Sequence, residues 1–126
     1  MKGNGMQGVL LFAHGSRDPL WRKPIEAVAD TIRQRQANVL VRCAYLELCE
    51  PSLPDAAAEL VAAGVGELRI LPMFLGMGKH AREDLPALVD ALRQAHAGVT
   101  VRVLPAVGEQ ARLTQLLADL ALEAQP

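Results

Sequence analysis

The fold is decided by the stretch Val9-Leu10-Leu11-Phe12-Ala13-His14-Gly15-Ser16-Arg17, close to the start of the 126-residue chain. Five apolar residues in a row are typical of a strand that is buried on both faces. The apolar run ends abruptly in a histidine, a glycine, a hydroxyl and a guanidinium, which is typical of a strand that opens into a reactive loop. We therefore take His14 as the starting point for the function.

Three more apolar runs follow the first, and four segments of helical period alternate with these runs. This alternation is typical of a parallel sheet with helices on both faces. Strands are expected at residues 7–13, 39–46, 67–74 and 99–104, and right-handed crossovers give the sheet order 2-1-3-4. The predicted fold class is therefore α/β, with a three-layer αβα arrangement around a four-stranded parallel sheet.

The expected helices have recognisable ends. Pro24 marks the firm start of the first helix, and Ser52 with Asp55 three residues later forms a variant of the capping box at the start of the second. Pro86 predicts that the third helix begins firmly near Asp84. A fourth helix is expected over 109–122 with one buried apolar face. The residues of that face are Leu113, Leu116, Leu117 and Leu120.

Length and composition narrow the class of protein. The chain fits a single domain over 1–126, with 1–6 as a flexible N-terminus. Its formal net charge of -1 argues against nucleic acid as a partner, and no apolar run approaches the ~20 residues of a membrane span. Without a secretory signal we expect a cytoplasmic location, where Cys43 and Cys49 remain free thiols.

Polar side chains follow three neighbouring strands of the predicted sheet. His14 follows the first strand, Glu47 the second, and His80 lies in the loop after the third. In open parallel sheets, ligands bind at the carboxyl ends of the strands where the strand order reverses, so we expect these three groups to meet there. They suit a divalent first-row metal, and the imidazoles also suit proton transfer; spacing alone does not separate the two roles. Glu50 competes with Glu47 for the inward position.

Cationic residues surround the expected site against a nearly neutral chain. They follow the first and third strands and suit an anionic ligand rich in carboxylates, although ordinary solvated charge is the competing interpretation. The Gly76-x-Gly78 pair lacks both the dinucleotide fingerprint and the P-loop pattern, so nucleotide binding is not indicated. The cationic residues are Arg17, Arg22, Lys23, Lys79 and Arg82.

Six sequence blocks follow one another along the chain. They are His14-Gly15-Ser16-Arg17, Tyr45-Leu46-Glu47, Glu50-Pro51-Ser52-Leu53, Leu71-Pro72-Met73-Phe74-Leu75, Gly78-Lys79-His80 and Arg82-Glu83-Asp84-Leu85-Pro86. Taken in this order, they resemble the small form of the sirohydrochlorin cobaltochelatase family, of CbiX type. The resemblance covers nearly all of the chain from the first strand to the fourth helix.

The resemblance implies a chelatase-like half-domain that acts as an ATP-independent lyase. It would insert Co(II), or in related enzymes Ni(II) or Fe(II), into sirohydrochlorin in tetrapyrrole and cobalamin biosynthesis, with the metal as substrate and no permanently bound cofactor. It implies that His14 and His80 bind the metal and accept the pyrrole protons, and that Glu47 is an acidic metal ligand. The carboxylates of the tetrapyrrole would then meet Arg17, Lys79 and Arg82.

The resemblance also bears on assembly. Larger relatives hold two similar halves in one chain, so a chain with one half is expected to form a homodimer with the active site between subunits. Four apolar residues near the expected cleft are candidates for contact with the macrocycle or the partner, and they are Trp21, Met73, Leu75 and Met77. Two other functions stay open, a carrier that binds metal or tetrapyrrole without turnover and a phosphate-handling enzyme that uses His14 with Arg17.

Overall fold

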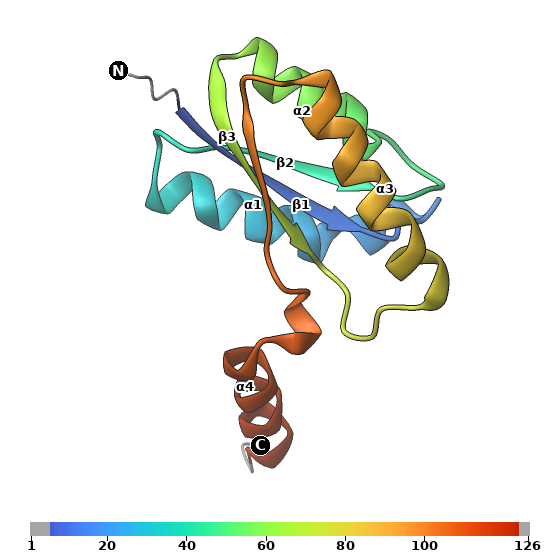
Figure 1. The fold of residues 1–126 in the computed structure, drawn as a ribbon. Coiled ribbons are helices and arrows are strands. Elements are labelled where there is room, and N and C mark those ends of the chain that lie inside the picture. Colours follow the sequence, from blue (N-terminus) through green and yellow to red (C-terminus); the bar gives the residue numbers. More distant parts are fainter. Residues whose placement is uncertain (1–5, 124–126) are drawn as a thin grey trace.

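The computed structural model describes residues 6–123 (Figure 1). Four parallel strands form one sheet in the order β2-β1-β3-β4, which confirms the predicted topology. The strands are β1 (Met6–Ala13), β2 (Leu40–Tyr45), β3 (Val65–Pro72) and β4 (Thr100–Val103). The expected flexible N-terminus over 1–6 lies outside the described residues except for Met6, which is already the first residue of β1.

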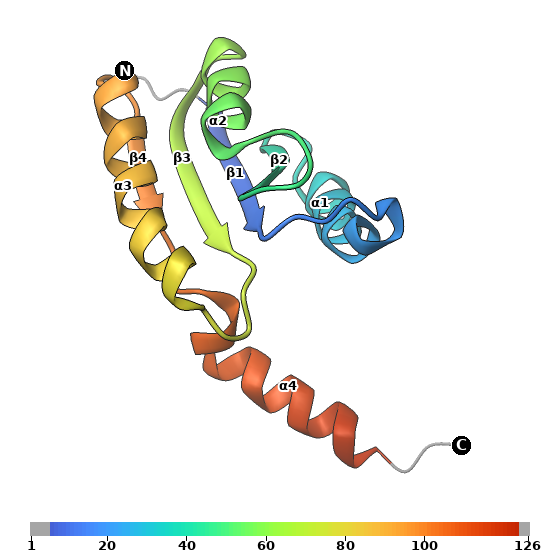
Figure 2. The same ribbon diagram turned by 90° about the vertical axis from the view of Figure 1, so that its right-hand side faces the viewer.

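Helices cover both faces of this sheet. Helix α1 (Lys23–Arg35), preceded by the short 3-10 helix η1 (Pro19–Arg22), lies on one face, whereas α2 (Leu53–Ala62) and α3 (Lys79–Ala95) lie on the other (Figure 2). The predicted cap of α2 is confirmed, because the hydroxyl of Ser52 accepts a hydrogen bond of 3.2 Å from the N–H of Asp55. No helix within residues 6–123 is long and apolar enough to cross a membrane.

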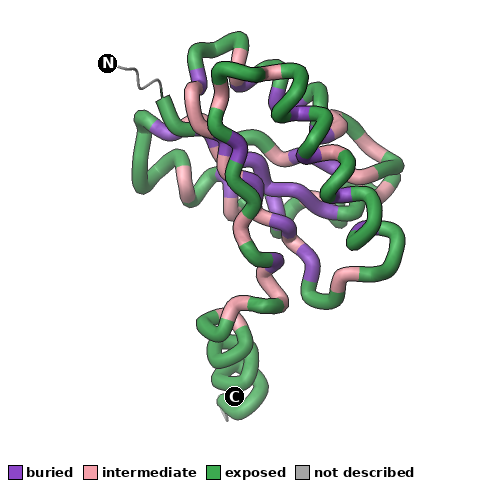
Figure 3. Tube along the Cα trace, in the orientation of Figure 1, coloured by how far each residue is buried: buried purple, intermediate pink, exposed green. Residues whose placement is uncertain are grey.

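The core is split by the sheet into two parts. Alternate residues of a strand face opposite sides, so Leu10 and Phe12 pack toward α2 and α3 while Leu11 and Ala13 pack toward α1. All four are at most 1% exposed, and Figure 3 shows the buried residues concentrated along the sheet. The apolar run that opens the chain is therefore the centre of the fold, as its composition predicts.

Helix α3 begins earlier than the sequence predicts. It starts at Lys79 rather than near Asp84 and carries Pro86 in its interior. A proline inside a helix leaves the carbonyl four residues earlier without its usual donor, here that of Arg82. Both residues lie on the exposed side of α3, where water can bond that carbonyl. The correction matters for function because His80 lies in the first turn of a helix and not in a loop.

The last helix is also placed differently from the prediction. Helix α4 (Ala111–Leu122) follows the short helix η2 (Val107–Glu109) and projects away from the sheet (Figures 1 and 2). None of its residues is buried, so the expectation of four buried leucines is wrong for a single chain. The leucine spacing predicts the helix and its apolar stripe, but it carries no information on which surface covers that stripe.

At each edge of the sheet, an arginine side chain from a helix bonds to a backbone carbonyl of the edge strand, and we call these two contacts the arginine clamps. A guanidinium nitrogen of Arg33 in α1 donates a hydrogen bond of 2.9 Å to the carbonyl of Val41 in the edge strand β2. At the opposite edge, Arg93 of α3 donates an equally long bond to the carbonyl of Val101 in β4. Edge strands present unpaired backbone groups, and each arginine occupies one of them.

Candidate functional site

The candidate site lies at the carboxyl end of the sheet. Because β1, β2 and β3 run parallel, the segments that follow them start at the same edge. His14, Glu47 and Met73 each come just after one of these strands. The N–H of Glu47 donates a hydrogen bond of 3.0 Å to the carbonyl of His14, and the N–H of Met73 donates one of 2.7 Å to the carbonyl of Phe12. The three segments are thus tied together by backbone bonds beyond the strands themselves.

Gly15 lets the chain turn between His14 and Arg17. Its φ of 104° lies in the left-handed region that side chains other than glycine rarely adopt. A Cβ atom at this position would collide with the backbone carbonyl of Glu47. Only glycine therefore allows the segments after β1 and β2 to pack this closely. The structure places His14 and Glu47 side by side at the level of the backbone.

The ring of His14 is oriented by Phe74. The two ring centroids are 4.8 Å apart and the planes meet at 77°, which is an edge-to-face arrangement. Phe74 is only 3% exposed and makes a second edge contact with Phe12, at 5.9 Å. His14 itself is exposed. A buried aromatic pair therefore supports an exposed imidazole. The sequence does not reveal this role of Phe74, because a phenylalanine just after β3 looks like an ordinary core residue.

His80 approaches the same edge from α3. It follows Lys79, the first residue of the helix, and precedes Ala81, which is buried and anchors this turn to the core. Within residues 6–123 of one chain, no three side chains of His, Cys, Asp or Glu lie close enough together to hold a metal ion. The predicted ligand set of His14, His80 and Glu47 is therefore not preassembled in a single chain.

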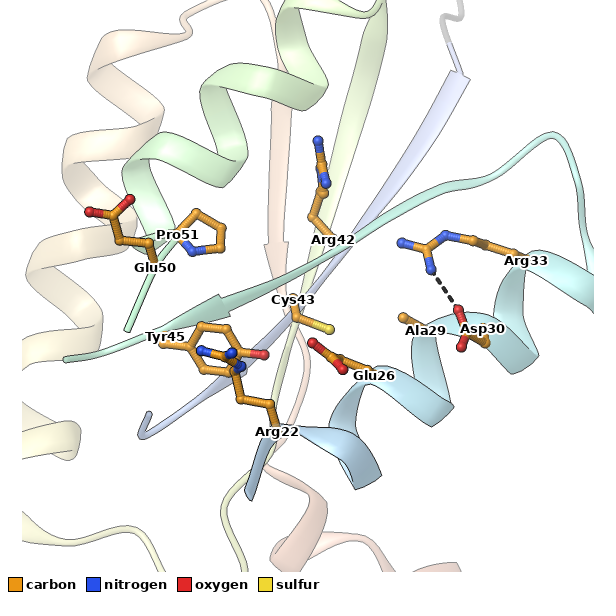
Figure 4. Close-up of a pocket in the computed structure, with 10 residues that line it drawn as sticks. All are labelled: Arg22, Glu26, Ala29, Asp30, Arg33, Arg42, Cys43, Tyr45, Glu50 and Pro51. Atoms are coloured by element: carbon orange, nitrogen blue, oxygen red, sulfur yellow. Dashed lines mark hydrogen bonds and ion pairs between the residues drawn. The ribbon is translucent and has the colours of Figure 1, made fainter. Parts of the chain in front are cut away.

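The alternative acidic residue, Glu50, lies elsewhere. It lines a cavity of about 420 Å³ between α1 and β2 together with Arg22, Glu26 and Cys43 (Figure 4). The backbone N–H of Glu47 instead donates a hydrogen bond to the carbonyl of His14, so the backbone of Glu47 adjoins His14.

Two titrating groups in this cavity are perturbed by burial. Burial raises the pKa of the Cys43 thiol; the hydrogen bond with Tyr45 opposes this rise, and the nearby Glu26 carboxylate adds a smaller increase. Burial likewise raises the pKa of Tyr45. Both cysteines are free thiols and half-buried, as the sequence predicts for their redox state.

The predicted cationic residues lie at the start of α3 and after β1. Arg17, Lys79 and Arg82 are all exposed. Arg82 also supports the loop before α3, since one guanidinium nitrogen donates a hydrogen bond of 3.0 Å to the carbonyl of Met77. Arg17 follows His14 after β1, and Lys79 and Arg82 flank His80 at the start of α3.

Large apolar side chains are exposed in all three segments of the site. Leu20 and Trp21 after β1, Leu48 after β2 and Leu75 after β3 are between 37% and 68% exposed. Leu48 has a φ of 70°, a left-handed conformation that is strained for a leucine. Trp21 and Leu75 thus match the expected apolar contacts, whereas Met73 and Met77 are half-buried. This edge of the sheet combines cationic side chains, imidazoles and exposed apolar side chains. Such a surface suits a large ligand that has an apolar body and acidic groups at its periphery.

Known proteins resemble the chain over most of its length. The model of the CbiX family matches residues 8–124. A sirohydrochlorin cobaltochelatase of Methanosarcina acetivorans is 34% identical over 65% of this chain and 63% of its own length. One from Methanothermobacter thermautotrophicus is 39% identical, and the alignment spans 57% of that protein. A third, from Methanococcoides burtonii, is 28% identical over 92% of both chains. The chain thus aligns with less than two thirds of the first two relatives.

Solved structures agree with this likeness. A CbiX protein from Marinobacter aquaeolei VT8 superposes with a TM-score of 0.77 and 34% identity, covering 91% of this chain and 93% of that one. The sirohydrochlorin chelatase SirB from Bacillus subtilis subspecies spizizenii, solved with cobalt, gives a TM-score of 0.76 at 18% identity and shares the fold. It covers 90% of this chain but 49% of the SirB chain. The family match over residues 8–124, together with the shared parallel sheet, shows that this chain belongs to the CbiX family.

Proposed function

We propose that this protein inserts a divalent metal, Co(II) before Ni(II) or Fe(II), into sirohydrochlorin. The observation that carries the proposal is the placement of His14. Gly15 and the Glu47 backbone fix its position, Phe74 orients its ring, and the imidazole faces the open edge of the sheet. The names of the archaeal relatives supply the reaction class.

The chemistry needs a group to receive protons and a group to deliver the metal. Two pyrrole N–H bonds break as the macrocycle takes the metal through its nitrogen lone pairs, and the two protons must pass to bases. His14 and His80 supply imidazoles, which both ligate first-row metals and accept protons near neutral pH. Glu47 adds a charged oxygen ligand beside His14. The protein therefore strips water from the substrate metal and receives the displaced protons at one edge.

The surrounding residues suit the tetrapyrrole itself. Arg17, Lys79 and Arg82 offer cations to the peripheral carboxylates, while Trp21, Leu48 and Leu75 offer apolar surface to the ring. Binding energy gained at the rim can support a bent macrocycle in which a pyrrole lone pair meets the metal. The same arrangement makes no use of a nucleotide.

We further propose that the chain acts as a homodimer, with the site between the two subunits. This chain covers 49% of the SirB chain, so a working unit built from two copies of this chain would match that protein in length. A three-ligand set that one chain does not assemble by itself is compatible with ligands drawn from two chains. Free, half-buried thiols suit a reducing compartment and support a cytoplasmic location.

The decisive test is metal insertion with histidine variants. Free sirohydrochlorin and Co(II) are mixed anaerobically with substoichiometric protein, and the absorbance of the macrocycle is followed, with Ni(II) and Fe(II) in parallel. We expect many turnovers for the wild type and losses of about 100-fold or more for His14→Ala and for His80→Ala. The matched control is His96→Ala, at the C-cap of α3 and outside the site, which should keep the wild-type rate.

Each outcome of this assay decides between functions. A single stoichiometric binding event without turnover would identify a carrier and refute the enzyme. Wild-type rates in both site variants would refute the assignment of His14 and His80.

A further inference from the structure

Leu48 has the most unusual backbone conformation in the segment after β2. Its φ of 70° makes it the only residue other than glycine with a positive φ among residues 6–123. At such an angle the Cβ atom of an L-residue crowds its own backbone, and a leucine has no polar group that could offset the cost by a local hydrogen bond. Backbone strain of this kind is concentrated at active sites and ligand clamps, where the surrounding structure enforces it.

Hydrogen bonds on both sides of Leu48 enforce its conformation. The N–H of Glu47 donates a bond of 3.0 Å to the carbonyl of His14, which fixes the chain just before Leu48. The N–H of Tyr45 donates a bond of 2.9 Å to the carbonyl of Pro51, which brings the end of the loop back to its beginning. The chain must therefore reverse within the three residues between Glu47 and Pro51, and tight reversals of this kind commonly contain a left-handed residue.

The turn accounts for the backbone conformation but not for the leucine. Glycine and asparagine adopt a positive φ at little cost and are the usual residues of such turns. Leu48 does not offset the strain by packing, because it is 50% exposed and belongs to neither part of the core within residues 6–123. Its neighbours Leu46 and Cys49 do pack, one against each part of the core. In the free protein, a leucine at position 48 therefore adds strain and leaves apolar surface in water.

The surroundings of Leu48 indicate what covers its side chain. Leu48 directly follows Glu47, whose backbone adjoins His14, and Trp21 and Leu75 expose further apolar surface in the segments after β1 and β3. A metal ion gains nothing from an alkyl group, whereas the apolar body of a large ligand gains from every apolar side chain that it removes from water. The chemistry of the side chain therefore fits the macrocycle and not the metal.

We propose that Leu48 is a specificity-determining contact for the tetrapyrrole, and that the strained turn holds its side chain against one face of the macrocycle beside Glu47. The conformation lowers the stability of the free protein and provides an apolar contact in the complex. The inference rests on the function proposed above, because it takes sirohydrochlorin as the ligand. It adds that this one residue acts on recognition of the macrocycle and leaves recognition of the metal unchanged.

Stability and affinity should therefore change in opposite directions when Leu48 is replaced. Leu48→Asn relieves the strain, because asparagine tolerates a positive φ, and it removes the apolar contact at nearly constant size. We expect the midpoint of thermal unfolding to rise by about 2–5 °C. The dissociation constant for sirohydrochlorin, measured by absorbance titration without metal, should weaken roughly tenfold. The KM for Co(II) at saturating sirohydrochlorin should not change.

Two control variants separate the strain from the apolar contact. Leu48→Met keeps both an apolar side chain and the strain, so its affinity for sirohydrochlorin and its unfolding midpoint should stay close to those of the wild type. Leu75→Asn removes an apolar side chain that is 68% exposed at a position without a positive φ, so it should not raise the unfolding midpoint. Sedimentation velocity on Leu48→Asn and on the wild type should give the same oligomeric state.

The other outcomes would overturn the proposal. Wild-type affinity in Leu48→Asn would exclude the contact with the macrocycle, and a lower unfolding midpoint would show that the leucine serves the fold. A changed oligomeric state would assign Leu48 to a contact between subunits, and a raised KM for Co(II) would contradict its restriction to the macrocycle. The titration contains no metal, so a wild type that binds sirohydrochlorin without turnover would refute the proposed reaction alone. A wild type that does not bind it would refute both.

Discussion

The backbone carbonyl of Glu47 occupies the space in which any residue other than glycine at position 15 would carry its Cβ atom. The contact joins the segment after β1 to the segment after β2, and it sets His14 and Glu47 next to each other. It depends on a glycine for two separate reasons, the lack of space and the φ of 104°.

These two reasons can be separated by two substitutions. Gly15→Ala incurs both the collision and the left-handed strain, so we expect the free energy of unfolding to fall by roughly 2–4 kcal/mol. Gly64→Ala, at a φ of 103° with open space around it, incurs the strain alone and should lose about 1–2 kcal/mol. Urea unfolding measures both. Equal losses would show that the Glu47 carbonyl moves aside freely.

The edge contact between Phe74 and His14 makes Phe74 a positioning residue. We expect Phe74→Leu to lower kcat for metal insertion about tenfold, because the imidazole loses its orientation, while KM for sirohydrochlorin changes little. Phe12→Leu is the control. It removes the partner ring of Phe74 without touching His14, so it should lower thermal stability to a similar extent with a smaller loss of kcat. Parallel losses of kcat in the two variants would contradict the positioning role.

The cations at the site edge should act on binding of the tetrapyrrole. Replacing Arg17 or Lys79 by glutamine removes one exposed charge, so we expect KM for sirohydrochlorin to rise about three- to tenfold, with a smaller effect at high salt. Arg35→Gln, at the far end of α1, is the control and should leave KM unchanged. Steady-state kinetics at two ionic strengths measures the effect. A rise that is independent of salt would argue against a charge interaction with the ligand.

Stability should fall at alkaline pH because of Cys43. Burial raises the pKa of this thiol above its ordinary value of 9.0, so the folded protein holds the proton more tightly than the unfolded chain. The resulting stabilisation is fully present below pH 9 and is lost as the pH rises through the folded-state pKa. Tyr45, whose pKa burial also raises, adds to the decline above pH 10.

The free energy of unfolding measured in urea from pH 7 to pH 10 checks this prediction. In Cys43→Ala the free energy of unfolding should fall less between pH 9 and pH 10 than it does in the wild type, whatever the stability of the variant at pH 7. An identical slope would exclude Cys43 as its source.

Much of the fold follows from local pattern. The Ser52 cap and the burial of the first apolar run could be predicted because each depends on residues close together in the chain, and the strand order because right-handed crossovers limit the possible topologies. The start of α3 could not, because the anchoring of Ala81 in the core outweighs the local preference of Pro86. The free position of α4 could not either, since an amphipathic period does not identify the covering surface.

The candidate site, like the fold, could be predicted from the sequence only in part. Topology predicts which residues share an edge, and His14 and Glu47 do lie together there. Spacing does not reveal that Phe74 supports the imidazole or that the Glu47 backbone rests on Gly15, because both contacts join segments far apart in the sequence. The roles of His14, His80 and Glu47 in holding a metal stay predictions for the assays above.

The arginine clamps at the two sheet edges oppose the addition of a further strand. A protein that displays an uncovered leucine helix risks indefinite self-association, above all if its sheet can also lengthen strand by strand. Any incoming strand at β2 or β4 must first displace the bond from Arg33 to Val41 or the bond from Arg93 to Val101. Strand pairing at the edges is therefore disfavoured, and the sheet is protected against lengthening into a fibre.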